Sequence, residues 1–169
     1  MPFTPLHMGP GILVKAALQS SFSLMVFGWT QVVMDLQPLI VILTGEGHLH
    51  GFTHTYVGAT LIALFSAATG KHLSEWALGL IDLGDGRRMI RIRWWVVIVS
   101  AFVGSYSHVV LDSIMHGDME PLYPFSGDNR LLGWVSVSTL HEICIYSGLA
   151  GAILYALVWT FIRKDASRP

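Results

Sequence analysis

Charged residues are scarce in this chain. They make up 12% of its 169 residues, while 53% are hydrophobic. Ordinary soluble domains are about 25% charged, and a soluble fold of this length could not bury so much apolar surface. The net charge is −1, so the sequence has no basic footprint and we expect no nucleic-acid partner. Lipid is therefore the expected solvent for much of the surface.

Cysteine is almost absent, because Cys144 is the only one. A single cysteine excludes an internal disulfide, and we expect a buried thiol. Residues 1–7 lack the basic region that begins a secretory signal, so we expect them to remain in the mature protein. Internal repeats and low-complexity tracts are also missing. These absences predict one domain over residues 1–169.

Apolar runs suited to a membrane are present instead. A bilayer-spanning helix needs about 20 mostly apolar residues, and four stretches approach this length: 22–43, 55–69, 94–115 and 144–162. Backbone hydrogen bonding in lipid requires helices or closed barrels. We predict an all-α integral membrane bundle of about four transmembrane helices. Residues 11–18 predict an added N-terminal interfacial or re-entrant helix, or an extension of the first span.

Basic residues predict an orientation. They concentrate in residues 70–93 and in the C-terminal tail, whereas the other two loops together contain a single lysine or arginine, Arg130. The positive-inside rule places residues 70–93 in a cytoplasmic loop and the histidine-bearing loops outside the cytoplasm. With four spans, His7 would then lie on the opposite side from the other histidines unless the N-terminal segment re-enters the membrane.

Ionisable residues inside the predicted spans are the strongest functional signal. Each costs at least about 2.5–3.5 kcal/mol to insert, so it needs a partner or a function. His108 and Asp112 are four residues apart and share one helical face, and Asp35 lies in another span. Histidines and carboxylates that converge at low dielectric suit a divalent cation. The candidate metal ligands are His7, Asp35, His50, His54, His108, Asp112, His116 and His141. A hydrogen-bonded pair that fixes helix packing is the alternative for His108 and Asp112.

The loop after the third span contains further polar residues. Residues 116–126 are too polar for lipid and too rich in aromatics and prolines for a plain linker, so they suit a lid or a packed cap. Asp118, Glu120 and Glu142 are the candidate catalytic carboxylates that could carry a proton. Arg130 could meet an anionic group such as phosphate, or lie on the surface.

The order of these motifs resembles a known family. His7, Asp35 in a broken helix, His50-Gly-Phe-Thr-His54 and His108-x-x-x-Asp112 resemble the predicted membrane-bound metal-dependent hydrolases of bacteria, which include an inner-membrane, SOS-associated member. The order is also similar to that of zinc-dependent phospholipase C and P1 nuclease. The resemblance implies an inner-membrane location, Asp112 as a bridging ligand and one or two ions, with zinc expected. The processed N-terminal amine and the later His-x-x-x-Glu pair of that fold are not reproduced.

Two classes of function follow. The leading one is a multi-pass membrane hydrolase in which a metal-activated water attacks a phosphoester or lipid-linked substrate near the membrane surface. The other is a non-catalytic membrane metal-binding protein or a metal or proton transporter, functioning as an oligomer if four spans are too few. Haem binding is less favoured because axial ligation of haem iron by histidine does not require Asp35 or Asp112.

Overall fold

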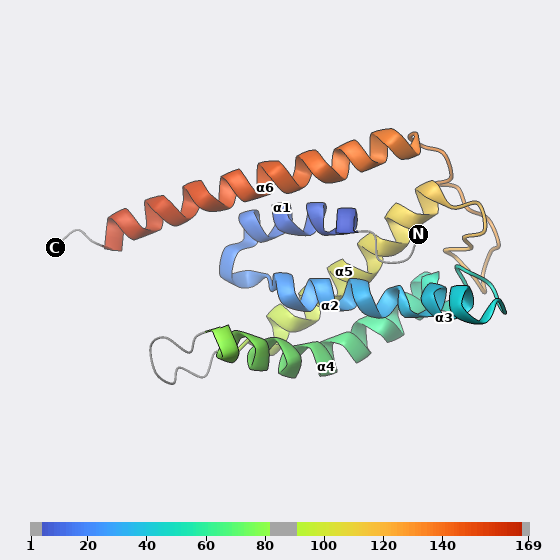
Figure 1. Ribbon diagram of the computed structural model, residues 1–169, viewed down its shortest axis with the longest axis horizontal. Coiled ribbons are helices and arrows are strands. Elements are labelled where there is room, and N and C mark those ends of the chain that lie inside the picture. Colours follow the sequence, from blue (N-terminus) through green and yellow to red (C-terminus); the bar gives the residue numbers. More distant parts are fainter. Residues whose placement is uncertain (1–4, 82–90, 167–169) are drawn as a thin grey trace.

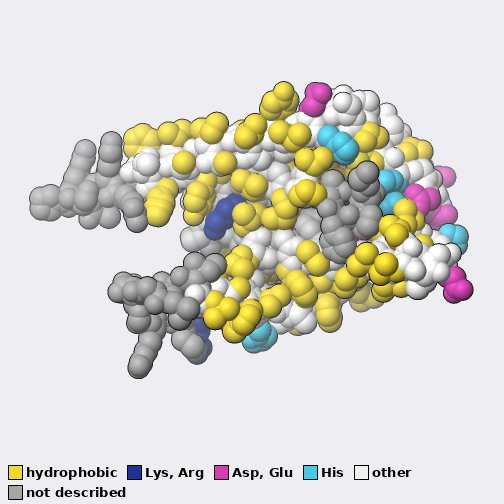
Figure 2. Space-filling model, viewed as in Figure 1, with side chains coloured by type: hydrophobic (Ala, Val, Ile, Leu, Met, Phe, Trp, Pro, Cys, Tyr) yellow, Lys and Arg dark blue, Asp and Glu magenta, His cyan; other side chains and the backbone are white. Residues whose placement is uncertain are grey.

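The computed structural model describes residues 5–81 and 91–166, and every regular element among them is helical. Three short 3-10 turns accompany six α-helices (Figure 1): α1 (Met8–Leu18), α2 (Leu24–Met34), α3 (Leu36–Thr44), α4 (Tyr56–Ile81), α5 (Trp94–Met115) and α6 (Val137–Ala166). The predicted all-α fold is confirmed. Apolar side chains cover the flanks of the molecule (Figure 2), as expected for a membrane protein.

The first predicted span consists of two helices that meet at Asp35. Ser23 caps the start of α2, where its hydroxyl accepts a hydrogen bond from the Val26 amide at 3.4 Å. Pro38 has no amide proton and its ring crowds the preceding turn, which explains the break between α2 and α3. Gly45 ends α3 in the left-handed conformation at φ 73°.

The fourth helix differs from the prediction. It continues to Ile81, so residues 70–81 are helical rather than part of a cytoplasmic loop that begins at residue 70. The reason is a polar cluster: Lys71 pairs with Glu75 one turn later and donates to the Ile92 carbonyl at 2.8 Å. Residues 82–90, the centre of the predicted basic loop, lie outside the described residues.

Three described helical segments are long and apolar enough to cross a membrane, namely Leu24–Thr44, Trp94–Met115 and Val137–Phe161. The second predicted span, residues 55–69, lies in α4, which is not among them. The last span begins at Val137 rather than at residue 144 because the helix includes the more polar turns before Cys144.

The core of the bundle is formed by α2, α4 and α5, which pack against one another. Small side chains let the helices approach closely, as is usual in membranes. Ala63 of α4 and Ala101 of α5 are fully buried beside Val26. Trp29 of α2 donates its indole proton to the Thr69 hydroxyl of α4 at 2.9 Å. This bundle provides a rigid support for the polar end described below.

The first helix folds back on the bundle. It packs along α6 (Figure 1), and an added Cβ at Gly9 would lie 1.9 Å from the Cys144 carbonyl oxygen. Lys15 closes the following turn by donating to the Gln19 and Phe22 carbonyls at 2.7 and 2.8 Å. The chain therefore enters α1 at the end of the molecule where α5 finishes (Figure 1).

Candidate metal centre

Five of the candidate ligands come from four separate segments that meet at one end of the bundle. His108 and Asp112 occupy the last turns of α5, and Asp35 lies at the α2–α3 break. His7 immediately precedes α1, and His54 precedes α4. Acidic and histidine side chains gather at this end in Figure 2, in contrast to the apolar flanks.

Asp112 lies at the centre of the cluster. Its Oδ2 atom is 3.2 Å from His108 Nε2 and 3.7 Å from His54 Nε2, and its Oδ1 atom is 3.6 Å from His7 Nε2. Asp35 Oδ1 is 3.5 Å from His108 Nε2. All five side chains are buried. In two groups of buried residues the donor atoms all lie within 4.8 Å of one another. One group is His7, His108 and Asp112, and the other is Asp35, His54 and His108.

The same imidazole nitrogens lack hydrogen bonds. Nε2 of His7, His54 and His108 is buried and makes no hydrogen bond of acceptable geometry within the described residues, although each faces a carboxylate. Two ligand atoms about 2.1 Å from a common ion lie about 3.0–3.4 Å apart in octahedral or tetrahedral geometry. The observed separations of 3.2–3.7 Å are close to that range. The donor set therefore fits a divalent cation better than a set of direct hydrogen bonds.

Gln31 orients His108. Its Oε1 atom accepts a hydrogen bond from His108 Nδ1 at 2.6 Å, and its Nε2 donates to the Gly104 carbonyl at 3.0 Å. A proton on Nδ1 leaves the Nε2 lone pair directed at the two carboxylates, as in many histidine–metal sites. This contact was not predicted from the sequence. Only the packing of α2 on α5 creates it.

A second hydrogen-bonded chain positions His54. Its Nδ1 atom lies 3.0 Å from the Thr53 hydroxyl. Gln37 of α3 accepts a hydrogen bond from the Thr53 amide at 3.2 Å. The start of α3 therefore supports the loop that carries His54. No motif in the sequence indicated a role for Gln37 or Thr53.

Three predicted residues form an outer group at the mouth of the site. His50 Nδ1 lies 2.9 Å from both Asp118 oxygens, and the His50 ring stacks on His116 with 4.2 Å between centroids. The other nitrogen of His50 is 4.0 Å from Asp112 Oδ2. Asp118, predicted to carry a proton, thus also orients His50 towards the buried ligands.

Burial controls the charge of the imidazoles outside the spans. Desolvation lowers the pKa of His7 to about 4 and that of His54 to about 3, and repulsion from any proton on His108 is the second cause. Burial likewise lowers the pKa of His116. At Asp118, partial burial alone would raise the pKa of the carboxyl. The hydrogen bond from His50 and the electrostatic attraction to His50 outweigh burial, so the pKa of this carboxyl is lowered. Neutral imidazoles with available lone pairs are the form that binds a metal.

The remaining predicted residues lie farther out. His141 and Glu142 belong to the first turns of α6, and neither is in a described group of potential ligands. Arg130 is exposed and lies 3.9 Å from Asp128. A cavity of about 310 Å³ adjoins the outer group and is lined by His48, His50, Gly51, Phe52, Thr55, Asp118, Glu120 and Tyr123. Glu120 therefore faces the cavity rather than the buried ligands.

These features define an α-helical integral membrane protein with a polar, histidine-rich centre at one end of its bundle. The sequence model of the YdjM inner membrane protein family matches residues 11–166. The chain belongs to this family, which establishes its membrane location. No curated protein and no solved structure matches the chain.

Proposed function

We propose that the protein is a membrane-bound metal-dependent hydrolase that cleaves a phosphoester or a lipid-linked substrate near the membrane surface. The observation that carries the proposal is the convergence of three buried imidazole Nε2 atoms, on His7, His54 and His108, upon two buried carboxylates. The order of these ligands along the chain, similar to that of zinc-dependent phospholipase C, supports the same chemistry.

The donor atoms favour zinc, in one or two ions. Nitrogen and carboxylate ligands in a compact set are typical of zinc. Asp112 would hold one or two ions, because Oδ1 faces His7 while Oδ2 faces His54 and His108. When bound, such an ion would lower the pKa of a water molecule towards 7 and polarise the bond to be cleaved. His116 and His50 could complete a second ion at the mouth.

Carboxylates at the mouth could move the proton that hydrolysis releases. Asp118 and Glu120 line the cavity beside His50, so either can accept a proton from a water molecule that enters there. Glu142 is exposed on α6 and is the weaker candidate. Asp118 already accepts the His50 proton at 2.9 Å, which leaves Glu120 as the preferred base.

The orientation of the site is part of the proposal. Arg91 and Arg93 precede α5 and Lys71 lies near them through its bond to Ile92. These residues lie at the end of α5 opposite to His108 and Asp112. With basic residues in the cytoplasm, the metal centre opens to the extracytoplasmic side.

The test combines metal content with turnover. We expect purified protein to contain zinc and to hydrolyse a phosphoester, and His108→Ala to lose both because His108 belongs to both groups of buried ligands. His72→Ala is the matched control, since His72 is exposed near Trp94. Full metal occupancy in His108→Ala would refute the site. If the protein binds metal and supports ion or proton flux in liposomes but hydrolyses no phosphoester, the transporter would be favoured.

A further inference from the structure

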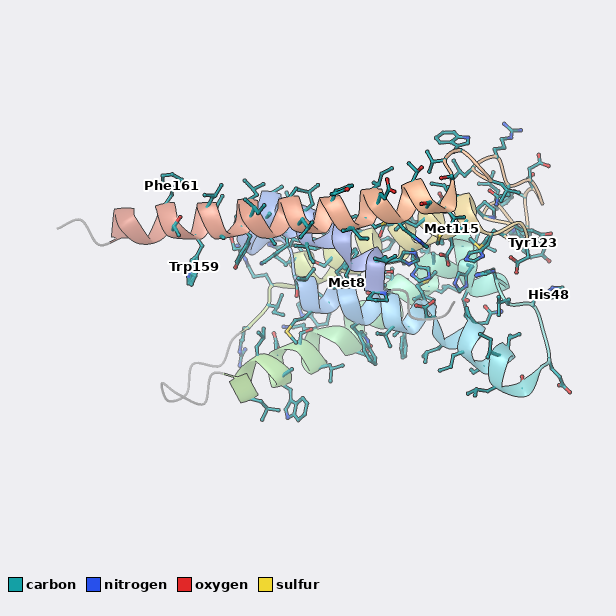
Figure 3. All side chains as sticks on the ribbon, turned by 45° about the horizontal axis from the view of Figure 1, so that its top comes forward. Met8, His48, Met115, Tyr123, Trp159 and Phe161 are labelled. Atoms are coloured by element: carbon teal, nitrogen blue, oxygen red, sulfur yellow. The ribbon has the colours of Figure 1, made fainter. Side chains whose placement is uncertain are left out.

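The third helix leaves the bundle beside the candidate metal centre. It begins directly after Asp35, and in Figure 3 it turns away from the line of α2. Pro38 is its only buried residue, while Ile40, Ile42 and Leu43 are 58%, 52% and 76% exposed. Its nine residues extend for about 13.5 Å at 1.5 Å per residue. Such an apolar helix is unsuited to water.

The depth of the site follows from α5. The 22 residues of α5 are about 33 Å long, close to the hydrocarbon thickness of about 30 Å. Trp94 and Trp95 at its first turn are exposed and suit one membrane interface. Asp112 lies one turn before the other end, so the centre is at the level where acyl chains give way to headgroups. Because α3 begins at Leu36, directly after Asp35 of the same centre, it leaves the bundle at that level.

Gln37 links α3 to the loop that lines the cavity. Its amide oxygen accepts from the Thr53 amide at 3.2 Å, and its nitrogen donates to the His48 carbonyl at 3.4 Å. An added Cβ at Gly51 would lie 2.1 Å from this nitrogen. The position of α3 is therefore coupled to the loop that holds His50 and His54.

The opposite wall of the cavity is also apolar at its rim. Tyr123 lines the cavity and is 49% exposed, and the neighbouring Leu122 and Phe125 are 44% and 86% exposed. This turn lies in the loop that follows α5, six residues after the helix ends. Figure 3 shows Tyr123 and His48 at the same end of the molecule. Tyr123 thus lines the cavity itself, while α3 is joined to the His48 side of the cavity through Gln37.

We propose that α3 is an interfacial arm in the boundary between headgroups and acyl chains, and that it presents the cavity to lipid headgroups together with the Leu122–Phe125 turn. The occupant of this surface is the bilayer itself, since α3 is the exposed second half of the apolar Leu24–Thr44 segment and the turn lies at the same end of the molecule (Figure 3). Given the proposed hydrolase function, the substrate is a resident phospholipid. Its polar part enters the cavity while its acyl chains remain beside α3.

Fluorescent labelling tests the arm without any enzyme assay. Cys144 is the only cysteine and is buried, so Cys144→Ala gives a background for single labels at Leu43→Cys and Phe125→Cys. Glu46→Cys and Asp128→Cys are exposed polar controls. In vesicles of phosphatidylethanolamine and phosphatidylglycerol, a lipid carrying a shallow nitroxide should quench the first two labels several-fold more strongly than the controls.

Two outcomes of this experiment overturn the proposal. If aqueous iodide quenches the label at Leu43→Cys as strongly as the label at Glu46→Cys, α3 lies in water. Protection of the Leu43→Cys label from both quenchers, with cross-linking between copies of the chain, would place a second copy on α3. Either result is independent of hydrolysis.

Turnover then tests the substrate class. Ile40→Asn should lower hydrolysis of vesicle phospholipid about tenfold, a change of about 1.4 kcal/mol, because it disturbs the seating of α3 in lipid. Hydrolysis of a water-soluble phosphodiester should stay within about twofold. Leu64→Asn is the matched control on the lipid-exposed surface of α4. Equal loss on both substrates in Ile40→Asn would refute lipid access along α3. A wild type that cleaves neither substrate would refute the hydrolase alone.

Discussion

Replacing Asp112 with asparagine is the most direct test of the metal centre. The substitution keeps the shape of the side chain but removes its charge. Asp112 presents one oxygen to His7 and the other to His54 and His108, at 3.2–3.7 Å. We expect Asp112→Asn to fold and to lose nearly all of its affinity for zinc, because both carboxylate oxygens face the place where the ion would bind.

The size of the loss follows from the number of contacts. An interaction with a charged group contributes about 1.5–3 kcal/mol, so two oxygens account for about 3–6 kcal/mol, or roughly 10²–10⁴ in affinity. At an ion concentration about a thousandfold above Kd, binding stabilises the wild type by about 4.1 kcal/mol. A variant that binds about a thousandfold more weakly gains about 0.4 kcal/mol at that concentration.

Thermal unfolding in detergent measures this difference. For a chain of this size, about 2–4 °C per kcal/mol predicts that zinc raises the Tm of chelator-stripped wild type by about 8–16 °C. The same addition should raise the Tm of Asp112→Asn by only about 1–2 °C. Asp128→Asn, on an exposed turn, should respond as the wild type does. An undiminished zinc response in Asp112→Asn would show that the cluster is not a metal centre.

Three further predictions concern the surroundings of the site. Gln31→Leu removes the acceptor for His108 and should weaken zinc binding about 10–100-fold in competition with a chelator; unchanged affinity would refute its orienting role. The pKa values of His7 and His54, about 4 and 3, lie below the ordinary 6.5. Between pH 6.5 and 4 the unfolded chain therefore binds more protons than the folded chain. The Tm of ion-free protein should fall as the pH drops through this range, and a flat profile would contradict this. Gly9→Ala should destabilise the protein by about 1–3 kcal/mol in thermal unfolding, whereas Gly79→Ala, with open space around it, should not; equal Tm values for the two variants would refute the close packing of α1.

Part of the site follows from local spacing. His108 and Asp112 are one helical turn apart, so any helix through this segment brings them together, and their atoms lie 3.2 Å apart. Asp35 and His54 were grouped with them because of the order of motifs along the chain. The structure brings both into the cluster. Whether the cluster holds an ion stays a prediction.

The place of His7 could not be read from the spans. Counting spans put this residue on the side opposite to the other histidines, unless the chain re-entered the membrane. The α1–α2 hairpin removes the conflict, because it returns the chain to the polar end. The hairpin depends on the close contact of Gly9 with Cys144 in α6 and on Gln19 at φ 48°. Such long-range contacts leave no periodic signal.

The sequence did contain a signal for the extension of α4 beyond residue 70. Lys71 and Glu75 have the spacing of a helical ion pair, and the structure joins them. Counting Lys71 as a loop residue hid this pattern. The error affects orientation, because a buried lysine within a helix is weaker evidence for a cytoplasmic loop than an exposed one. Arg91 and Arg93, both exposed before α5, are better evidence.

Charge balance gives an argument for a cation that does not depend on the identity of the family. Asp35 and Asp112 together carry two negative charges in a buried centre, and burial keeps His7 and His54 neutral near pH 7. A proton on His108 supplies one positive charge against the two carboxylates. Each ionised group inserted at this depth costs at least about 2.5–3.5 kcal/mol. One divalent cation would balance both carboxylates and also occupy the three Nε2 atoms that make no hydrogen bond, which protonation of a single histidine cannot do.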